Sequence, residues 1–194
     1  MTKEVLKQKP IIKTIFDIIS AIEPLDETEE EHIKDVLEWV TTTESIFRIK
    51  KPNIPNKHLV SYFVLFDEAA RKILLVDHKK AQLWLPTGGH VDINEHPMEA
   101  ARRECAEELG IEAEFWINEP IFLTSTITTG LTSGHIDISL WYVLKGNHKA
   151  KYNFDEGEFN SIKWCAFDEI PYEKSDPYMR RFIKKLQKHA FREK

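Results

Sequence analysis

The sequence predicts a mixed α/β protein that is preceded by a helical N-terminal segment. Three observations support this prediction: apolar residues recur at helical spacing in the first fifty residues, β-rich runs begin at residue 58, and one helix has clear sequence signals at both ends. The chain has 194 residues, 42% of them apolar and 30% charged, so it is long enough to bury a core. Disordered, collagen-like and low-complexity classes are excluded.

Residues 1 to about 43 are predicted to form a helical hairpin. Isoleucines recur at helical spacing up to Pro24, and a second helix with an acidic first turn is expected to begin at Asp26 or Thr28. The apolar stripes of these helices must be covered, either by the sheet or in a homodimer. The segment KKPNIPNK then marks a boundary between an extension, residues 1–50, and the main domain, residues 51–194.

Strands and helices alternate after this boundary, and the first two strands are joined by a short turn. We expect strands at 58–67, 72–78, 120–129, 135–145 and 161–167, and helices at 97–109 and 176–190.

Charge and cysteine content limit the partners and the compartment. The net charge of −5 gives no general attraction to a long nucleic acid or to a membrane surface. Cys105 and Cys165 lack CxxC spacing, which argues against a zinc cluster or a disulfide framework and fits a reducing cytoplasm. No window approaches the ~20 apolar residues that span a bilayer, and the N-terminus has no signal-peptide core. We therefore expect a cytoplasmic protein.

The segment LPTGGHVDINEHPMEAARRECAEELGI, residues 85–111, contains three of the seven glycines. Pro97 suits the first position of a helix and Gly110 suits its C-terminal end, which together predict a helix over 97–109. At 100° per residue, this helix buries one stripe, formed by Met98, Ala101, Cys105 and Leu109.

Glu104, Glu107 and Glu108 share a neighbouring face of the same helix. Like charges at this spacing destabilise a helix unless a cation lies between them, and carboxylate oxygens suit Mg²⁺ or Mn²⁺. Arg103 lies one turn before Glu107 and could hold a carboxylate by a bidentate pair. For the helix taken alone, a solvated acidic face is the more common explanation.

The spacing of the whole segment resembles the Nudix box. The matching positions are Gly89, Glu95, Arg103, Glu104, Glu107, Glu108, Gly110 and Ile111. The match is direct over residues 89–111 and looser over about 58–172. Cys105 departs from the usual Leu, Ile or Val, but a small buried hydrophobe leaves the acidic face unchanged.

The resemblance implies an α/β/α sandwich with a mixed sheet, and a hydrolase that needs Mg²⁺ or Mn²⁺. Family members cleave a nucleoside diphosphate that is linked to another group, so a small nucleotide is the expected partner. The resemblance makes Glu104, Glu107 and Glu108 metal-binding carboxylates, Arg103 the residue that orients a catalytic glutamate, and Glu95 a tie between loop and helix. It also makes the Gly89 carbonyl a neutral metal ligand.

Polar residues outside the box are weaker candidates. His135, Asp137 and Ser139 lie on one face of a predicted strand, where they could line the substrate pocket, hold a general base or form an ordinary hydrogen-bonded sheet face. His90 could contact a phosphate or cap its loop. A late acidic loop could supply a base or an extra ligand, or form a solvated turn, and its candidates are Asp155, Glu156 and Glu158.

A nucleotide-sensing module and a diphosphate isomerase are the two alternative functions. A nucleotide-sensing or regulatory module without hydrolysis would use the helical hairpin to contact a partner, but such modules tend to lose box residues. An isomerase of diphosphates would need an altered box and a cysteine in the pocket, whereas Cys105 is predicted to be buried. The substrate stays open, because Thr126 stands where ADP-ribose enzymes tend to have proline.

Overall fold

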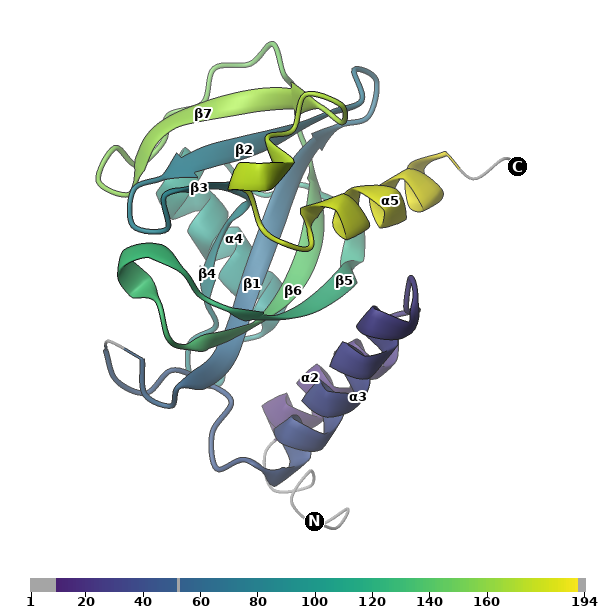
Figure 1. The fold of residues 1–194 in the computed structure, drawn as a ribbon, viewed down its shortest axis with the longest axis vertical. Helices are drawn as coiled ribbons and strands as arrows, with labels where there is room; N and C mark the ends of the chain where they lie inside the picture. Colours follow the sequence, from purple (N-terminus) through teal and green to yellow (C-terminus); the bar gives the residue numbers. More distant parts are fainter. Residues whose placement is uncertain (1–9, 52, 192–194) are drawn as a thin grey trace.

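The computed structural model describes residues 10–51 and 53–191, and its elements follow the predicted order (Figure 1). The helices are α2 (Pro10–Ser20), α3 (Glu27–Thr42), α4 (Pro97–Leu109) and α5 (Met179–Ala190), with short 3-10 turns at Gly130–Thr132 and Tyr172–Lys174. The strands are β1 (Lys57–Asp67), β2 (Lys72–His78), β3 (Leu83–Leu85), β4 (Thr87–His90), β5 (Phe115–Ile127), β6 (Ile136–Lys145) and β7 (Phe159–Ala166).

The predicted bounds are closest where the sequence signals are local. The structure confirms α4 over residues 97–109 and β2 over 72–78. Strand β5 begins at Phe115, five residues before the predicted start, and the short strands β3 and β4 were not predicted. Residues 1–9, which belong to the predicted hairpin segment, lie outside the described residues.

The strands form one mixed seven-stranded sheet around the long strand β1. Its order is β3-β2-β1-β6-β5, with β4 also paired to β1 and β7 to β2. Strands β1 and β6 run parallel, and this register places His58 opposite Asp137. Strand β4 runs antiparallel to β1, with His90 opposite Val60 and Gly89 opposite Ser61. Three segments that are distant in sequence thus meet near the start of β1.

Helices cover both faces of the sheet, which makes the predicted α/β/α sandwich (Figure 1). Successive residues of β1 alternate between the two cores, as the period of a strand requires. Leu59, Phe63 and Leu65 pack in the core that includes α2, α3 and α4, whereas Val64 and Phe66 pack in the core that includes α5.

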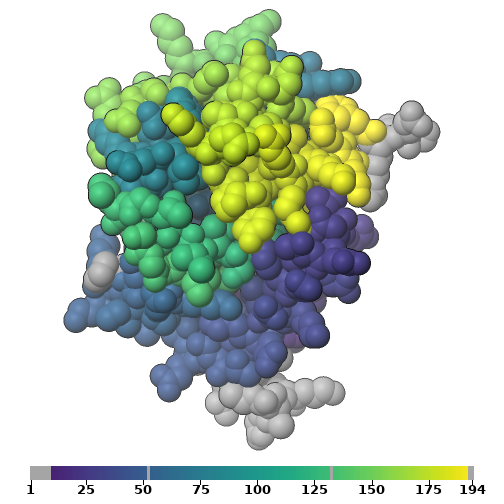
Figure 2. Space-filling model, in the orientation of Figure 1, coloured from purple at the N-terminus to yellow at the C-terminus, as the bar shows by residue number. Residues whose placement is uncertain are grey.

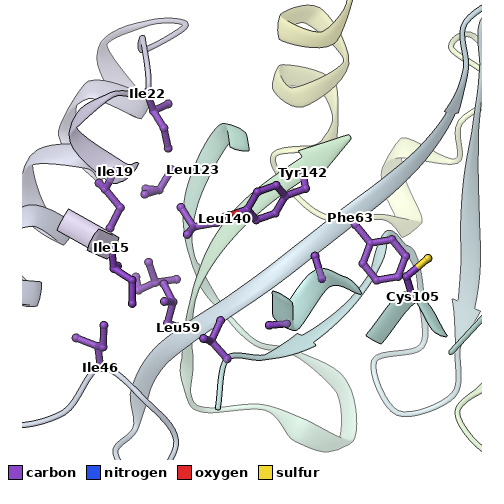
Figure 3. Packing of buried hydrophobic residues seen from close by; sticks show 14 of the residues in the cluster. Ile15, Ile19, Ile22, Ile46, Leu59, Phe63, Cys105, Leu123, Leu140 and Tyr142 are labelled. Atoms are coloured by element: carbon purple, nitrogen blue, oxygen red, sulfur yellow. The ribbon is translucent and has the colours of Figure 1, made fainter. Parts of the chain in front are cut away.

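The N-terminal hairpin shares the first of these cores with the sheet. Ile15 and Ile19 of α2 are fully buried in the same cluster as Leu123 and Leu140 of the sheet (Figure 3). The sequence left open whether the apolar stripes of the hairpin pack on the sheet or in a homodimer, and in the structure they pack on the sheet. Burial of each such side chain contributes about 1.5–3 kcal/mol, so the hairpin adds substantially to the stability of the whole fold.

A buried ion pair joins the hairpin to the C-terminal helix. Lys185 Nζ of α5 donates to Glu29 Oε1 of α3 at 2.6 Å. The Leu123 backbone N–H also donates to Glu29 Oε1, at 3.2 Å, and the Leu25 N–H donates to Glu29 Oε2 at 2.7 Å. In Figure 2 the purple N-terminal helices and the yellow C-terminal segment lie next to each other on the surface.

Candidate active site

Helix α4 begins and ends where its capping signals indicate. Pro97 occupies the first turn, His96 Nδ1 accepts a hydrogen bond from the Met98 N–H at 3.1 Å, and Gly110 ends the helix with φ 64°. A left-handed residue at this position favours glycine. The stripe of Ala101, Cys105 and Leu109 is fully buried against the sheet, so Cys105 faces the core and no reacting group.

The three box glutamates are not uniformly solvated. Glu108 is only 6% exposed, and Glu104 is mostly buried, whereas the Glu107 side chain is 61% exposed. The alternative of a solvated acidic face therefore fits Glu107 alone. The carboxylates of Glu104 and Glu108 therefore point toward the protein interior, and that of Glu107 lies at the surface.

Strand β4 brings the backbone against these carboxylates. The Gly88 N–H donates to Glu108 Oε2 at 2.9 Å. A Cβ placed on Gly89 would lie 2.2 Å from Glu104 Oε1, and a Cβ on Gly88 would lie 2.2 Å from the Ser61 carbonyl oxygen. Gly88, with φ 139°, requires glycine because a side chain would collide with main chain, whereas a side chain at Gly89 would displace the Glu104 carboxylate. The Gly89 backbone is consequently in close reach of the carboxylate group.

The carboxylate cluster holds an excess of negative charge. Burial, followed by the charge of Glu104, raises the pKa of Glu108 well above its usual value, and the Gly88 hydrogen bond only partly opposes this. Burial also raises the pKa of Glu104, against the lowering effect of Arg103. The strongest charges acting on Glu108 are all carboxylates, Glu104, Glu158 and Asp155. A nearby cation would favour the charged forms of these carboxylates.

Arg103 ties the loop before α4 to the helix. Its Nε and Nη2 donate to Glu95 Oε1 and Oε2, each at 3.0 Å, in a bidentate pair. Its Nη1 donates to Glu104 Oε1 at 2.6 Å and its Nη2 to the His90 carbonyl at 3.1 Å. The sequence reasoning from helical spacing paired Arg103 with Glu107, but that contact is longer, at 3.6 Å. The bidentate partner is Glu95, the residue that the resemblance named.

The late acidic loop contributes selectively to this cluster. Glu158 and Asp155 both raise the pKa of Glu108, and Glu158 also raises that of Glu104, although in each case burial is the largest cause. The carbonyl of Glu156 accepts from Lys79 Nζ, and its side chain is exposed. Of the two glutamates predicted from this loop, the structure brings Glu158 to the box and leaves Glu156 at the surface.

A second polar cluster lies at the start of β1 and β6. It contains the predicted candidates His90, His135 and Asp137, together with His58, which sequence reasoning missed. His58 opens a strand that is otherwise apolar, and only the parallel pairing of β1 with β6 shows that it faces Asp137. Ser139 is buried two residues further along β6.

The pKa values of His90 and Asp137 are both lowered, but for different reasons. Burial, reinforced by Arg48, lowers the pKa of His90 to about 3. Burial alone would raise the pKa of Asp137, but contacts with His135 and His58 lower it to about 2. The cluster therefore combines a neutral imidazole with an ionised carboxylate.

A helix with clustered glutamates beside a Gly-Gly strand, inside an α/β/α sandwich, is the architecture of a Nudix hydrolase. The NUDIX domain family matches residues 56–186, and the chain belongs to this family. Nudix hydrolases act on pyrophosphate bonds of small nucleotide substrates and generally use divalent metal ions.

Solved structures share the fold. A NUDIX family hydrolase from Clostridium perfringens aligns with TM-score 0.53 and 23% identity, over 67% of this chain and 96% of that one. A MutT NUDIX hydrolase from Burkholderia pseudomallei aligns with TM-score 0.52 and 21% identity, over 66% and 96%. A MutT protein from Methanosarcina mazei Go1 aligns with TM-score 0.51 and 21% identity, over 68% and 93%. No curated protein matches the sequence significantly. In the described part of the chain, no helix is long and apolar enough to cross a membrane.

Proposed function

We propose that the protein is a metal-dependent hydrolase that cleaves the diphosphate linkage of a nucleoside diphosphate joined to another moiety. The observation that carries this proposal is the inward-facing pair Glu104 and Glu108, which share a small volume with other carboxylates and with the Gly89 backbone. A nearly buried carboxylate surrounded by like charges is costly unless a cation binds there.

The donor set fits Mg²⁺ or Mn²⁺. Carboxylate oxygens of Glu104, Glu107 and Glu108 and the carbonyl oxygen of Gly89 are hard ligands, which these ions prefer. A bound divalent ion supplies charge neutralisation for the diphosphate and lowers the pKa of a bound water. Glu107, at the exposed rim, suits a site that must also accept a substrate from solvent.

Other residues of this chain hold the site in shape. Arg103 holds Glu104 of the helix and Glu95 of the preceding loop at the same time, so the positions of the helix and the loop are fixed relative to each other. In addition to burial, Glu158 raises the pKa of both Glu104 and Glu108, whereas Asp155 acts on Glu108, and we assign Glu158 the role of accessory carboxylate, as ligand or base. In the reaction, water attacks one phosphorus, the bridging P–O bond breaks, and two phosphate-bearing products leave.

Hydrolysis can be tested with purified protein and a substrate panel. The panel contains nucleoside triphosphates, nucleotide sugars, ADP-ribose and dinucleoside polyphosphates, each with Mg²⁺ or Mn²⁺. We expect turnover of at least one class, at least ~100-fold slower in Glu107→Gln, because a direct ligand should matter more than the outer contacts that cost ~10–100-fold. Glu99→Gln is the matched control, because Glu99 lies on the same helix and pairs with exposed Arg102.

Two results would contradict this proposal. The first is equal turnover by wild type and Glu107→Gln. The second is nucleotide binding without turnover of any substrate, which would instead support a nucleotide-sensing module.

A further inference from the structure

The cluster of His58, His90, His135 and Asp137 is separate from the Nudix carboxylates. Gly89 and His90 are neighbours on β4, so their side-chain positions lie on opposite faces of the strand. Gly89 faces Glu104 on the α4 side, whereas His90 has the same register as Val60 and turns toward the other face, where it meets His58. The two clusters therefore lie on opposite faces of β4.

The donor atoms of this second cluster have the spacing of metal ligands. One donor atom from each of the four residues lies within 4.8 Å of all the others. His58 Nε2 is 3.0 Å from His90 Nε2 and 3.2 Å from Asp137 Oδ1, and His135 Nε2 is also 3.2 Å from Asp137 Oδ1. Zinc bonds of 2.0–2.1 Å place neighbouring donors of a tetrahedron about 3.3 Å apart. Three of these separations are already close to that value.

Hydrogen bonds at the far side of two rings set their tautomers. His58 Nδ1 lies 2.9 Å from the Pro55 carbonyl oxygen, which can only accept, so Nδ1 carries the proton. With the proton on Nδ1, Nε2 is the ring atom that can offer a lone pair to a metal ion in the cluster. This is the outer-sphere arrangement that orients metal-binding histidines.

His135 is oriented in the same way. The Thr128 hydroxyl donates to the His135 carbonyl oxygen at 3.2 Å, and its oxygen lies 2.9 Å from His135 Nδ1. When the hydroxyl hydrogen points to the carbonyl, the hydroxyl oxygen can accept from Nδ1, and His135 Nε2 then presents a lone pair. In these tautomers both Nε2 atoms are available as metal ligands beside Asp137.

Both ring nitrogens approach Asp137 Oδ1, each to 3.2 Å. This oxygen is buried and has no well-directed hydrogen bond. In a hydrogen bond the oxygen would lie along the N–H direction. Around a shared ion the nitrogen lone pairs point at the ion and the oxygen lies off their axes, so poorly directed contacts of this length fit donors grouped around one ion.

We propose that His58, His90, His135 and Asp137 form a binding site for a first-row transition metal ion, with Zn²⁺ the best match. Three imidazoles and one carboxylate suit Zn²⁺ better than Mg²⁺, which prefers oxygen ligands. His90 Nε2 and His58 Nε2 are 3.0 Å apart, so metal binding requires that any proton shared between them moves to a ring Nδ1 or to solvent. Because the strands β1, β4 and β6 each supply a ligand, the ion links three strands of the sheet.

Cobalt and zinc binding to the purified full chain test this site. Excess Mg²⁺ is present to occupy the carboxylates, and Co²⁺ reports its geometry by visible absorption. We expect one Co²⁺ per chain with a tetrahedral spectrum, displaced by Zn²⁺. His90→Gln and His135→Gln should each weaken binding at least ~100-fold, since they remove a direct ligand. X-ray absorption of the zinc-loaded wild-type protein should show imidazole ligands.

Control variants separate this site from the Nudix box. Glu107→Gln should keep the cobalt spectrum, because Glu107 belongs to the other cluster. His96→Asn should also keep it, because His96 caps α4 outside the cluster and Asn preserves a cap. Circular dichroism checks that each variant folds, and the wild-type absorption data decide the question if a histidine variant does not. Absence of stoichiometric binding, an all-oxygen shell, or cobalt lost in Glu107→Gln but kept in the histidine variants would overturn the proposal.

Discussion

Glu29 and Glu108 are both buried glutamates, but their surroundings are opposite. Glu29, fully buried, accepts from Lys185 and from two backbone N–H groups, so its charge is matched. Glu108 accepts from one backbone N–H and has carboxylates as its strongest charged neighbours. Glu29 thus joins elements of the fold, whereas Glu108 is a carboxylate that we propose as a metal ligand.

Removal of the lysine that matches Glu29 should have the largest effect. We expect Lys185→Met to lower the free energy of unfolding by about 3–5 kcal/mol, because it leaves a buried charge uncompensated. The double variant with Glu29→Gln should recover most of the loss. Urea unfolding measures both, with exposed Lys184→Met as the control. A loss in Lys185→Met no greater than in Lys184→Met would show that the pair does not hold the helices together.

The same kind of neutralisation at Glu108 should affect activity instead of stability. Glu108→Gln is expected to reduce turnover at least ~100-fold, as a direct metal ligand is lost. Its metal-free stability should be equal or higher, because like charges are no longer buried together. Steady-state kinetics and urea unfolding without metal check the two halves. A clear loss of metal-free stability would place Glu108 in the same class as Glu29.

Arg103→Lys examines how the carboxylate group is held. A lysine cannot reproduce the bidentate pair with Glu95 and the simultaneous contact with Glu104. We expect affinity for Mn²⁺ to fall by ~10–100-fold, the range for outer-sphere contacts. Calorimetric titration gives the affinity. Arg102→Lys, on the exposed side of α4, should bind Mn²⁺ as wild type does, and equal affinities in both variants would exclude the positioning role.

Asp67 extends the comparison to a well-partnered aspartate. Burial raises its pKa, but the His148 N–H and ring and the Ala70 N–H outweigh this and lower it to about 2. Its stabilisation is therefore present above pH 4 and lost as pH falls from 4 to 2, amounting to at most about 2 kcal/mol. Acid unfolding of Asp67→Asn should show a smaller decline across this window. An unchanged acid profile would rule out this contribution.

Sequence reasoning was most successful where a signal is local. The Pro97 and Gly110 caps predicted α4 in full, whereas the short strand β4 beside it was not predicted. His58 was missed because its role depends on the pairing of β1 with β6, which lie almost eighty residues apart. Helical spacing likewise suggested Glu107 as the partner of Arg103, whereas the loop brings Glu95 closer.

The contact of α2 and α3 with the sheet could not be predicted for the same reason. An amphipathic stripe shows that a face will be buried, but its spacing contains no information on whether the cover is the same chain or another. The structure supplies Leu123 and Leu140 as that cover. Long-range topology, rather than local preference, decided the cases in which the sequence left alternatives.

The core that α2 and α3 share with the sheet determines which fragments of this protein can fold. A fragment limited to residues 56–186 would lack α2 and α3, so the apolar face of β5 and β6 that they cover would be exposed to solvent. Lys185 would also lose its buried counterion, Glu29. Such a fragment should aggregate on expression, even though it contains every residue of the Nudix box. The border of a recognisable module and the border of a self-sufficient folding unit do not coincide in this chain.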